Sequence, residues 1–325
     1  MDVKLTILIP TYNREQGLKS LLKNLQSQGH TGEYKIVVSD NHSDYDVQQM
    51  VSREFDSTFA DHITVNSWNF NIGMSSNISV SYLLVNTQWC WIISDDDEIM
   101  PHALDTVLGD IERFAYSDVM AVKYSLKDKV RHEDRSLKTL DEFMDYYDND
   151  ARKGELYYLS MLVNMEKAKK YLGFLTEYSY TYISFLIPLI KGLQDGKHVF
   201  VSQQELIKYS ERAKDNWSAV RYVNVMLGVR TFADIDFALS SKQEKRLLKI
   251  VSANLPLIRC TSKTVQQSNR FRRKLVWKNS YFFFKRNSNY AVRLLCRILY
   301  LLRFDLYEFA RTIYFKYINK TQQYS

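Results

Sequence analysis

The chain has 325 residues, 46% hydrophobic and 25% charged, which are ordinary values for a globular protein with one large domain or two smaller ones. Its three cysteines, Cys90, Cys260 and Cys296, lie far apart and match neither a zinc motif nor a disulfide framework, which indicates a reduced, cytoplasmic setting. No run reaches about 18 consecutive apolar residues, and no secretory signal opens the sequence, so neither a spanning helix nor export is expected.

The net charge of +7 is unevenly distributed along the chain. From Arg259 onward, 15 lysines and arginines accompany only Asp305 and Glu308, whereas the preceding residues carry 29 basic and 35 acidic side chains. A basic tail on an acidic body indicates an anionic surface as a partner.

Strand and helix patterns alternate through the first 125 residues. Short apolar runs predict buried strands at 5–10, 35–40, 63–68, 89–93 and 119–124. Amphipathic segments predict helices at 13–29, 46–55, 74–85 and 101–114. This order predicts an α/β fold, with a mostly parallel central sheet flanked by helices on both faces.

Two of these helices carry start signals. Asn13, with Gln16 three residues later, matches a capping box, so Asn13 is expected to cap the first helix. Pro101 suits the first turn of the helix that ends near Phe114.

The pattern weakens after residue 125. Residues 127–154 are expected to form a loop with a short helix near Leu140, and residues 198–202 a strand. Residues 178–192 predict a helix that Pro188 kinks. After about residue 217, helices are expected to dominate.

Three adjacent carboxylates, Asp95, Asp96 and Asp97, directly follow the predicted strand 89–93. Like charges repel, so such a run is best tolerated in solvent or around a cation. Open α/β sheets bind ligands at the carboxyl ends of their strands. Mn²⁺ and Mg²⁺ take oxygen ligands, typically one or two carboxylates together with substrate phosphates. The run therefore favours a metal that holds a phosphorylated ligand, and the alternative is a solvated acidic turn.

Three further polar motifs follow predicted strands. Residues 10–14 end the first strand, where exposed N–H groups can hold an anion and Tyr12 can stack on a base. Residues 39–44 end the second strand, and Asp40 can accept hydrogen bonds from a base or ribose. Residues 69–73 form an Asn- and Gly-rich turn. Each motif also has an ordinary explanation, as a strand–helix turn, a loop that caps a helix, or a tight turn.

Taken together, the four motifs resemble family 2 glycosyltransferases, which have the nucleotide-diphospho-sugar-binding fold called GT-A. The resemblance rests on Ile-Pro-Thr-Tyr-Asn-Arg at 9–14, Val-Val-Ser-Asp-Asn-His-Ser-Asp at 37–44, Asn-Ile-Gly at 71–73 and Trp-Ile-Ile-Ser-Asp-Asp-Asp at 91–97. The Ser-Asp-Asn and Ser-Asp-Asp-Asp segments are similar to bacterial O-antigen and capsule transferases, including abequosyltransferase-like proteins. The resemblance covers residues 1–125 well and residues 126–215 weakly.

The resemblance implies a nucleotide-sugar site at these motifs. Pro10, Thr11 and Tyr12 would line the nucleobase and ribose pocket, and Asp40 would receive a base N–H. The implied donor-binding residues are Pro10, Thr11, Tyr12, Arg14, Asp40, Asn41, Asn71, Gly73, Asn77, Asp95 and Asp96.

The resemblance also implies a role for the aspartate run. Asp95 would contact the ribose or the diphosphate, and Asp96 or Asp97 would bind Mn²⁺ or Mg²⁺. The family motif is often Asp-x-Asp, which here matches Asp95 and Asp97, so the register of the metal ligands stays open.

An inverting transfer needs a general base that takes the proton of the acceptor hydroxyl. In the family this base is an Asp or Glu roughly 80–100 residues past the metal motif, and Glu177 lies at that distance. Glu177 and Asp97 are the predicted catalytic residues. The alternative is that Glu177 simply favours the N-terminus of the helix expected to follow it.

Many family members carry an arginine near the third motif that contacts the phosphates. This chain has Asn77 nearby but no arginine from 54 to 112. Arg212 or Lys214, in a predicted loop at 210–217, is the expected source of that charge.

The C-terminal segment combines basic, aromatic and aliphatic residues. In a single helix, Arg286, Arg293, Arg297 and Arg311 would lie within about 40° of one another. Leucines and isoleucines between 294 and 302 cover much of the remaining surface. This pattern suits a helix in the headgroup layer of an anionic bilayer, and the alternative is a helix packed on the catalytic domain.

The predicted organisation is a catalytic domain at 1–217 and a helical, basic extension at 218–325. The catalytic domain would comprise a nucleotide-sugar half at 1–125 and an acceptor half at 126–217. The donor would carry UDP, in preference to CDP, TDP or GDP. The acceptor would be a lipid-linked saccharide in bacterial surface polysaccharide synthesis.

The expected place of work is the inner face of the cytoplasmic membrane, without nucleic acid as a partner. A nucleotidyltransferase acting on sugar phosphates is the alternative enzyme, but residues 10–16 lack the glycine-rich, basic phosphate loop that it would need. A nucleic-acid-binding protein is a further alternative, which only the basic tail supports.

Overall fold

The computed structural model describes residues 3–127, 133–148, 160–181, 183–208, 235–251 and 290–306, together with isolated residues between 228 and 310. The chain divides into two compact units, Met1–Ala213 and Lys214–Ser325.

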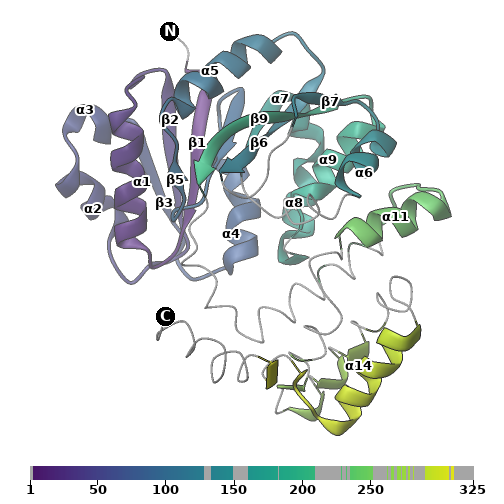
Figure 1. The fold of residues 1–325 in the computed structure, drawn as a ribbon. Helices are drawn as coiled ribbons and strands as arrows, with labels where there is room; N and C mark the ends of the chain where they lie inside the picture. The colour runs from purple at the N-terminus through teal and green to yellow at the C-terminus, as the bar shows by residue number, and fades with distance from the viewer. Residues whose placement is uncertain are drawn as a thin grey trace, which may run out of the picture. The chain divides into compact units, whose positions relative to one another are not determined.

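The first unit is built on a nine-stranded mixed sheet (Figure 1). Strands and helices alternate along its first half, as β1 (Leu5–Thr11), α1 (Glu15–Ser27), β2 (Tyr34–Asp40), α2 (Val47–Glu54), α3 (Ser57–Ala60), β3 (Ile63–Ser67), α4 (Met74–Ser81) and β4 (Trp89–Ile92). The spatial order is β3–β2–β1–β4, and all three pairings are parallel. The chain therefore crosses from one side of β1 to the other, and open α/β sheets bind ligands beside such a crossover.

The second half of the sheet adds strands of both directions. It contains β5 (Glu98–Ile99), β6 (Val119–Lys127), β7 (Arg135–Leu137), β8 (Met161–Asn164) and β9 (His198–Lys208). β8 runs antiparallel between β4 and β6, whereas β6 and β9 are parallel. β5 and β7 pair antiparallel with different parts of β9. The helices of this half are α5 (Ala103–Phe114), α6 (Leu140–Tyr147), α7 (Met165–Ala168), α8 (Leu172–Glu177) and α9 (Leu186–Gln194).

Helices cover both faces of the sheet (Figure 1). On one face Leu5, Ile7 and Ile9 of β1 and Trp89 and Trp91 of β4 join a core with α1, α2 and α5. On the other face the sheet contacts α4, α7 and α9. Burial on both faces explains why these strands are continuous apolar runs without polar alternation. The predicted α/β fold with a mostly parallel sheet is confirmed.

Three local predictions are wrong. Asn13 does not cap α1, because Arg14 takes the N-cap position and makes no side-chain capping hydrogen bond. Pro101 precedes α5 rather than starting it, since His102 is the N-cap and has a left-handed backbone. The expected loop at 127–154 contains a short strand, β7, that was not predicted. The short helix predicted near Leu140 is present as α6.

Residues 178–192 do not form one kinked helix. α8 ends at Glu177, a 3₁₀ turn follows at Ser179–Thr181, and α9 begins at Leu186. Pro188 therefore lies in the first turn of α9, where a backbone N–H has no partner within the helix. Proline needs no kink at that position.

In the second unit, the described segments include two helices, α11 (Ser241–Val251) and α14 (Tyr290–Leu302). α11 buries four apolar residues, Leu247, Leu248, Ile250 and Val251. α14 buries only Cys296 and Leu299. No helix in the described part of the chain is long and apolar enough to cross a membrane.

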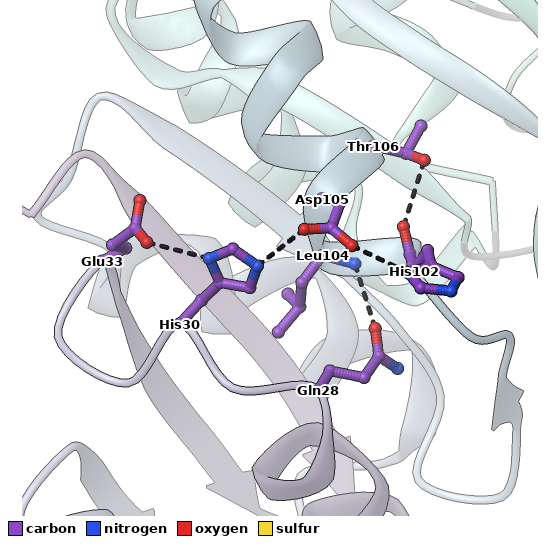
Figure 2. Close-up of polar contacts among 7 residues, drawn as sticks. All are labelled: Gln28, His30, Glu33, His102, Leu104, Asp105 and Thr106. Carbon is purple, nitrogen blue, oxygen red and sulfur yellow. Dashed lines mark hydrogen bonds and ion pairs between the residues drawn. The ribbon is translucent and has the colours of Figure 1, made fainter.

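A histidine clasp links the α1–β2 connection to the first turn of α5 (Figure 2). Nδ1 of His30 lies 2.8 Å from Oε1 of Glu33, and Nε2 lies 2.8 Å from Oδ1 of Asp105. The other carboxylate oxygen of Asp105 lies 3.1 Å from Nδ1 of His102. Hydrogen bonds with Glu33 and Asp105 raise the pKa of His30 above its ordinary value.

Protonation of His30 should stabilise the fold. Because the folded state raises the pKa of His30, its stabilisation is complete below the unfolded value, about 6.5, and is lost as pH rises through the folded value. The loss of unfolding free energy in His30→Asn should therefore be larger near pH 6 than near pH 8.5. Asparagine tolerates the left-handed backbone of His30. Urea titrations at both pH values measure the difference, and an equal loss at both would contradict the role of the clasp.

Candidate functional site

The candidate site lies at the carboxyl ends of β1, β2 and β4. The parallel register places Thr11 beside Asp40 and Leu8 beside Ile92. The N–H of Asn41 donates to the carbonyl of Thr11 at 2.9 Å, so the pairing of β1 and β2 extends past the end of β2. The first, second and fourth motifs therefore leave the sheet at the same edge.

Asp95 is the most deeply buried carboxylate of the aspartate run, with 4% of its surface exposed. Oγ1 of Thr11 donates to its Oδ2 at 2.7 Å, and Nη1 of Arg14 donates to its Oδ1 at 3.0 Å. Burial raises the pKa of Asp95 to about 6 and the nearby charge of Asp96 adds to the rise, whereas Arg14 and Thr11 oppose it. The ionised form of Asp95 thus depends on positive charge and hydrogen bonds around it.

Asp96 and Asp97 lie on the half-buried turn after Asp95. Oγ of Ser94 donates to Oδ1 of Asp96 at 2.6 Å, and the N–H of Asp97 donates to the carbonyl of Ser94 at 3.3 Å. Nη1 of Arg14 also forms an ion pair with Asp96. The turn thus presents adjacent carboxylates together with a guanidinium.

The carboxylate oxygens of this turn suit Mn²⁺ or Mg²⁺ as metal ligands. Within the described ranges, no group of three or more His, Cys, Asp and Glu residues is arranged to hold a metal ion. These ions do not require such a group, because one or two carboxylates suffice when substrate phosphates supply other ligands. Asp96 and Asp97 would hold the ion, with oxygen ligands of the right chemistry.

Gly17 allows the aspartate turn to lie directly against α1. A Cβ atom at this position would lie 2.8 Å from the backbone oxygen of Asp95, closer than real contacts allow. Sequence reasoning missed this residue, because a glycine inside an amphipathic helix gives no sign of what approaches it.

Asp40 is buried at the end of β2 and orders the loop that follows. Its Oδ1 accepts hydrogen bonds from the N–H and the Oγ of Ser43, at 3.0 and 2.6 Å. Asn13, which has a left-handed φ of 53°, binds the same loop. Its Nδ2 donates to Oδ2 of Asp44 and its Oδ1 accepts from the N–H of Asp44, both at 2.7 Å. The side chain of Asn13 therefore joins two loops of the site instead of capping a helix.

The third motif closes onto the second through asparagine side chains. Nδ2 of Asn41 donates to Oδ1 of Asn71 at 2.9 Å, and Oδ1 of Asn41 accepts from the N–H of Ile72 at 2.9 Å. The N–H of Gly73 donates to Oδ1 of Asn71 at 2.8 Å. Gly73 has a φ of 89°, which glycine adopts readily, and this turn leads into α4.

Asn77 serves the interior of the fold. Its Oδ1 accepts hydrogen bonds from Oγ of Ser39 at 2.7 Å and from Nε1 of Trp68 at 2.9 Å, and its Nδ2 donates to the carbonyl of Ser39 at 2.9 Å. Only 3% of Asn77 is exposed. Both ends of its amide therefore brace the end of β2 from α4.

The two remaining residues of the first motif, Pro10 and Tyr12, differ in exposure. Pro10 is buried within β1, whereas Tyr12 is 40% exposed beyond the strand.

Burial raises the pKa of Tyr45 to about 12, and the charges of Asp40 and Asp95 add to the rise. Tyr45 thus contributes a neutral phenol near two site carboxylates. Its position in a polar loop gave no signal of this.

The predicted base, Glu177, is exposed at the last residue of α8 and does not precede a helix as expected. α8 and the 3₁₀ turn after it contact α4, and the hydroxyl of Ser75 in α4 donates to the carbonyl of Ser179. Arg212 and Lys214, the predicted source of positive charge, lie outside the described residues.

A known family profile matches the segment that carries this site. Residues 6–165 match the family profile described as Glycosyl transferase family 2, over just under half of the chain. This part of the chain is therefore similar to family 2 glycosyltransferase domains, and its fold is GT-A.

Curated relatives match only in part. An abequosyltransferase of Salmonella typhimurium, RfbV, is 28% identical over 110 residues, which is 31% of this chain and 30% of the relative. The GalNAc(5)-diNAcBac-PP-undecaprenol beta-1,3-glucosyltransferase of Campylobacter jejuni is 27% identical over 105 residues, which is 32% of this chain and 33% of the relative. The chain thus aligns with about a third of the length of these relatives.

Solved structures match most of the chain at low identity, which shows the fold. S. aureus TarS 1–349 has a TM-score of 0.61 and 14% identity, over 93% of this chain and 89% of that one. The structure of TarS 1–349 in complex with UDP-GlcNAc has a TM-score of 0.64 over 93% of this chain and 89% of that one. A Pyrobaculum calidifontis mannosyltransferase, PcManGT, in complex with GDP-Man and Mn²⁺, has a TM-score of 0.52 and 13% identity, over 95% and 82%.

A methyl group at Gly17 should displace the aspartate turn. Gly109, exposed in α5, is the matched control, because a Cβ atom there would meet nothing within 4 Å beyond its own stretch of helix. Gly109→Ala should raise the free energy of unfolding by about 0.5–1 kcal/mol, because alanine favours the helix. Gly17→Ala should lower it by about 1–3 kcal/mol, because backbone must move. Urea titrations compare the two variants, and an equal gain in both would contradict the close contact.

Proposed function

We propose that the chain is a metal-dependent glycosyltransferase that moves a sugar from a nucleoside-diphosphate sugar to a hydroxyl group of a saccharide. The observation that carries the proposal is the junction of Asp95 with Thr11 and Arg14 at the crossover of the parallel sheet. This junction lies within the segment that matches family 2 glycosyltransferases.

The donor would bind along the edge formed by the first three motifs. Tyr12 is exposed there and would stack on the base. Asp40 would accept a hydrogen bond from the base or ribose, and its orientation is held by Ser43. Asn41, Asn71 and their shared turn would shape the opposite side of the pocket.

Asp96 and Asp97 would hold Mn²⁺ or Mg²⁺ beside the diphosphate. A divalent ion at that position neutralises charge that develops on the departing diphosphate. For an inverting transfer, we propose that the exposed carboxylate of Glu177 takes the proton of the acceptor hydroxyl.

The names of related proteins support the choice of substrates. The TarS complex contains UDP-GlcNAc and the mannosyltransferase complex contains GDP-Man with Mn²⁺, so a nucleoside-diphosphate sugar is the donor class that we propose, with UDP before GDP, CDP and TDP. The C. jejuni relative is named for an undecaprenol-linked acceptor, and the S. typhimurium relative transfers abequose by its name. They support a lipid-linked saccharide acceptor in bacterial surface polysaccharide synthesis.

The second unit would bring the enzyme to an anionic membrane surface, at the inner face of the cytoplasmic membrane. α14 exposes six large apolar residues, Tyr290, Leu294, Leu295, Ile298, Leu301 and Leu302. At 100° per residue they fall on one continuous arc of the helix, while Cys296 and Leu299 face the interior. Arg293 and Arg297 flank this arc on one side. An exposed apolar arc beside arginines suits the headgroup layer of an anionic bilayer.

Charges on the apolar arc should release the protein from membranes. Leu301→Glu with Leu302→Glu changes two residues that are 68% and 71% exposed, so folding should be retained. Binding to anionic vesicles should fall at least about tenfold, because two leucines can no longer enter the bilayer. The matched control is Leu83→Glu with Tyr116→Glu, two exposed apolar residues of the first unit. Co-sedimentation measures both, and equal binding of both variants and wild type would contradict the proposal.

The aspartate turn should be essential for transfer. Wild-type protein, incubated with Mn²⁺ and a panel of nucleotide sugars, should release free nucleoside diphosphate from its donor. Asp96→Ala and Asp97→Ala should each lower kcat at least about 100-fold, because charge on the leaving group is no longer stabilised. Asp61→Ala, at an exposed aspartate before β3, should retain full activity. Full activity in both site variants, or release of pyrophosphate from nucleoside triphosphates instead, would contradict the proposal.

A further inference from the structure

We propose that Arg14, which is paired with Asp95 and Asp96, competes with the divalent cation at this turn, where Asp96 is the carboxylate that both would use, and that Arg14 binds the diphosphate of the donor once it is displaced. This inference rests on the proposed function. It makes Arg14 the phosphate-binding residue that the third motif lacks.

The geometry of Arg14 carries the first step. A single nitrogen, Nη1, contacts both carboxylates, 3.0 Å from Oδ1 of Asp95 and paired with Oδ2 of Asp96. These oxygens belong to the turn that would hold the cation. A second cation cannot approach the same oxygens without strong repulsion from the guanidinium. Arg14 and a divalent ion therefore exclude one another from these oxygens.

The pair can open when another cation takes its place. The side chain of Arg14 is 44% exposed and can turn toward solvent, whereas that of Asp95 is only 5% exposed, so the ion must replace the charge that Arg14 withdraws. Asp95 keeps the hydrogen bond from Thr11 when Arg14 leaves, so this buried carboxylate is not left without a partner. A divalent ion offers twice the charge of the guanidinium and would win the competition.

A displaced guanidinium has the right chemistry for a diphosphate. Arginine carries five N–H donors in a planar fork that suits phosphate oxygens, and the contacts of Arg14 with the two carboxylates use only Nη1. Arg14 precedes α1 at the edge where the donor would bind. No arginine occurs from 54 to 112, so the third motif does not provide this charge.

The consequence is a coupling between the two ligands. Cation binding releases Arg14 toward the diphosphate, and a diphosphate that holds Arg14 leaves the carboxylates to the cation. By linkage, each ligand raises the affinity of the other.

The test measures binding on the full chain, without turnover. Mn²⁺ affinity is measured by electron paramagnetic resonance of the free ion, and the affinities of UDP, GDP, CDP and TDP by calorimetry at saturating Mn²⁺. Arg14→Gln should bind Mn²⁺ alone roughly fivefold tighter than wild type, because the competitor is gone. It should bind the nucleotide roughly tenfold more weakly. Arg53→Gln, which removes the same charge from an exposed pair with Glu15, should change either affinity less than about twofold.

Unchanged or weaker Mn²⁺ binding by Arg14→Gln would overturn the inference, and so would unchanged nucleotide binding. Arg14→Lys keeps the charge but not the fork, and should bind Mn²⁺ as wild type does while losing roughly threefold in nucleotide affinity. If Arg14→Gln does not fold, unchanged nucleotide affinity in Arg14→Lys overturns the inference. If the wild-type protein binds Mn²⁺ but none of the four nucleotides, the proposed function is wrong. This outcome is distinct from those that overturn only the role of Arg14.

Discussion

The burial of Asp95 is the constraint on which the site depends. A carboxylate in the interior needs hydrogen bonds or opposite charge, and Thr11 and Arg14 provide both from the end of β1. That requirement locks the turn after β4 to the loop after β1, the two strands that meet at the crossover of the sheet. Gly17 permits the close approach. The neighbouring aspartates, both half-buried, are thereby held at this edge of the sheet.

Side-chain amides hold the remaining loops in place. Asn13 joins the β1–α1 loop to Asp44, Asn41 joins the β2–α2 loop to Asn71, and Asn77 braces the end of β2. Each amide donates and accepts at once, so it can link two backbone segments that have no regular pairing. These links preorganise an edge from which the ring of Tyr12 extends into solvent. A site built in this way would need little ordering to bind the proposed donor.

The two units differ in the side chains that they expose. The first unit gathers carboxylates at a sheet edge, which suits cation and diphosphate chemistry. The second presents apolar side chains of α14 next to arginines, which suits an anionic lipid surface. Under the proposed function, this division would account for the acidic body and basic tail of a chain of net charge +7. For a transferase with a lipid-linked acceptor, the tail would keep the enzyme where its acceptor is anchored.

Residue order alone determined the strands of the parallel half and the edge at which the motifs lie. Burial on both faces makes such strands continuous apolar runs, and polar residues directly after them must lie at their carboxyl ends. What the polar groups contact was decided by the tertiary structure. Asn13 matches a capping box, yet its partner Asp44 is 31 residues away. Asn77 looks like a ligand contact, yet its amide serves Ser39 and Trp68. Local patterns describe neighbours along the chain, whereas hydrogen bonds are chosen among neighbours in space, and only folding brings those together.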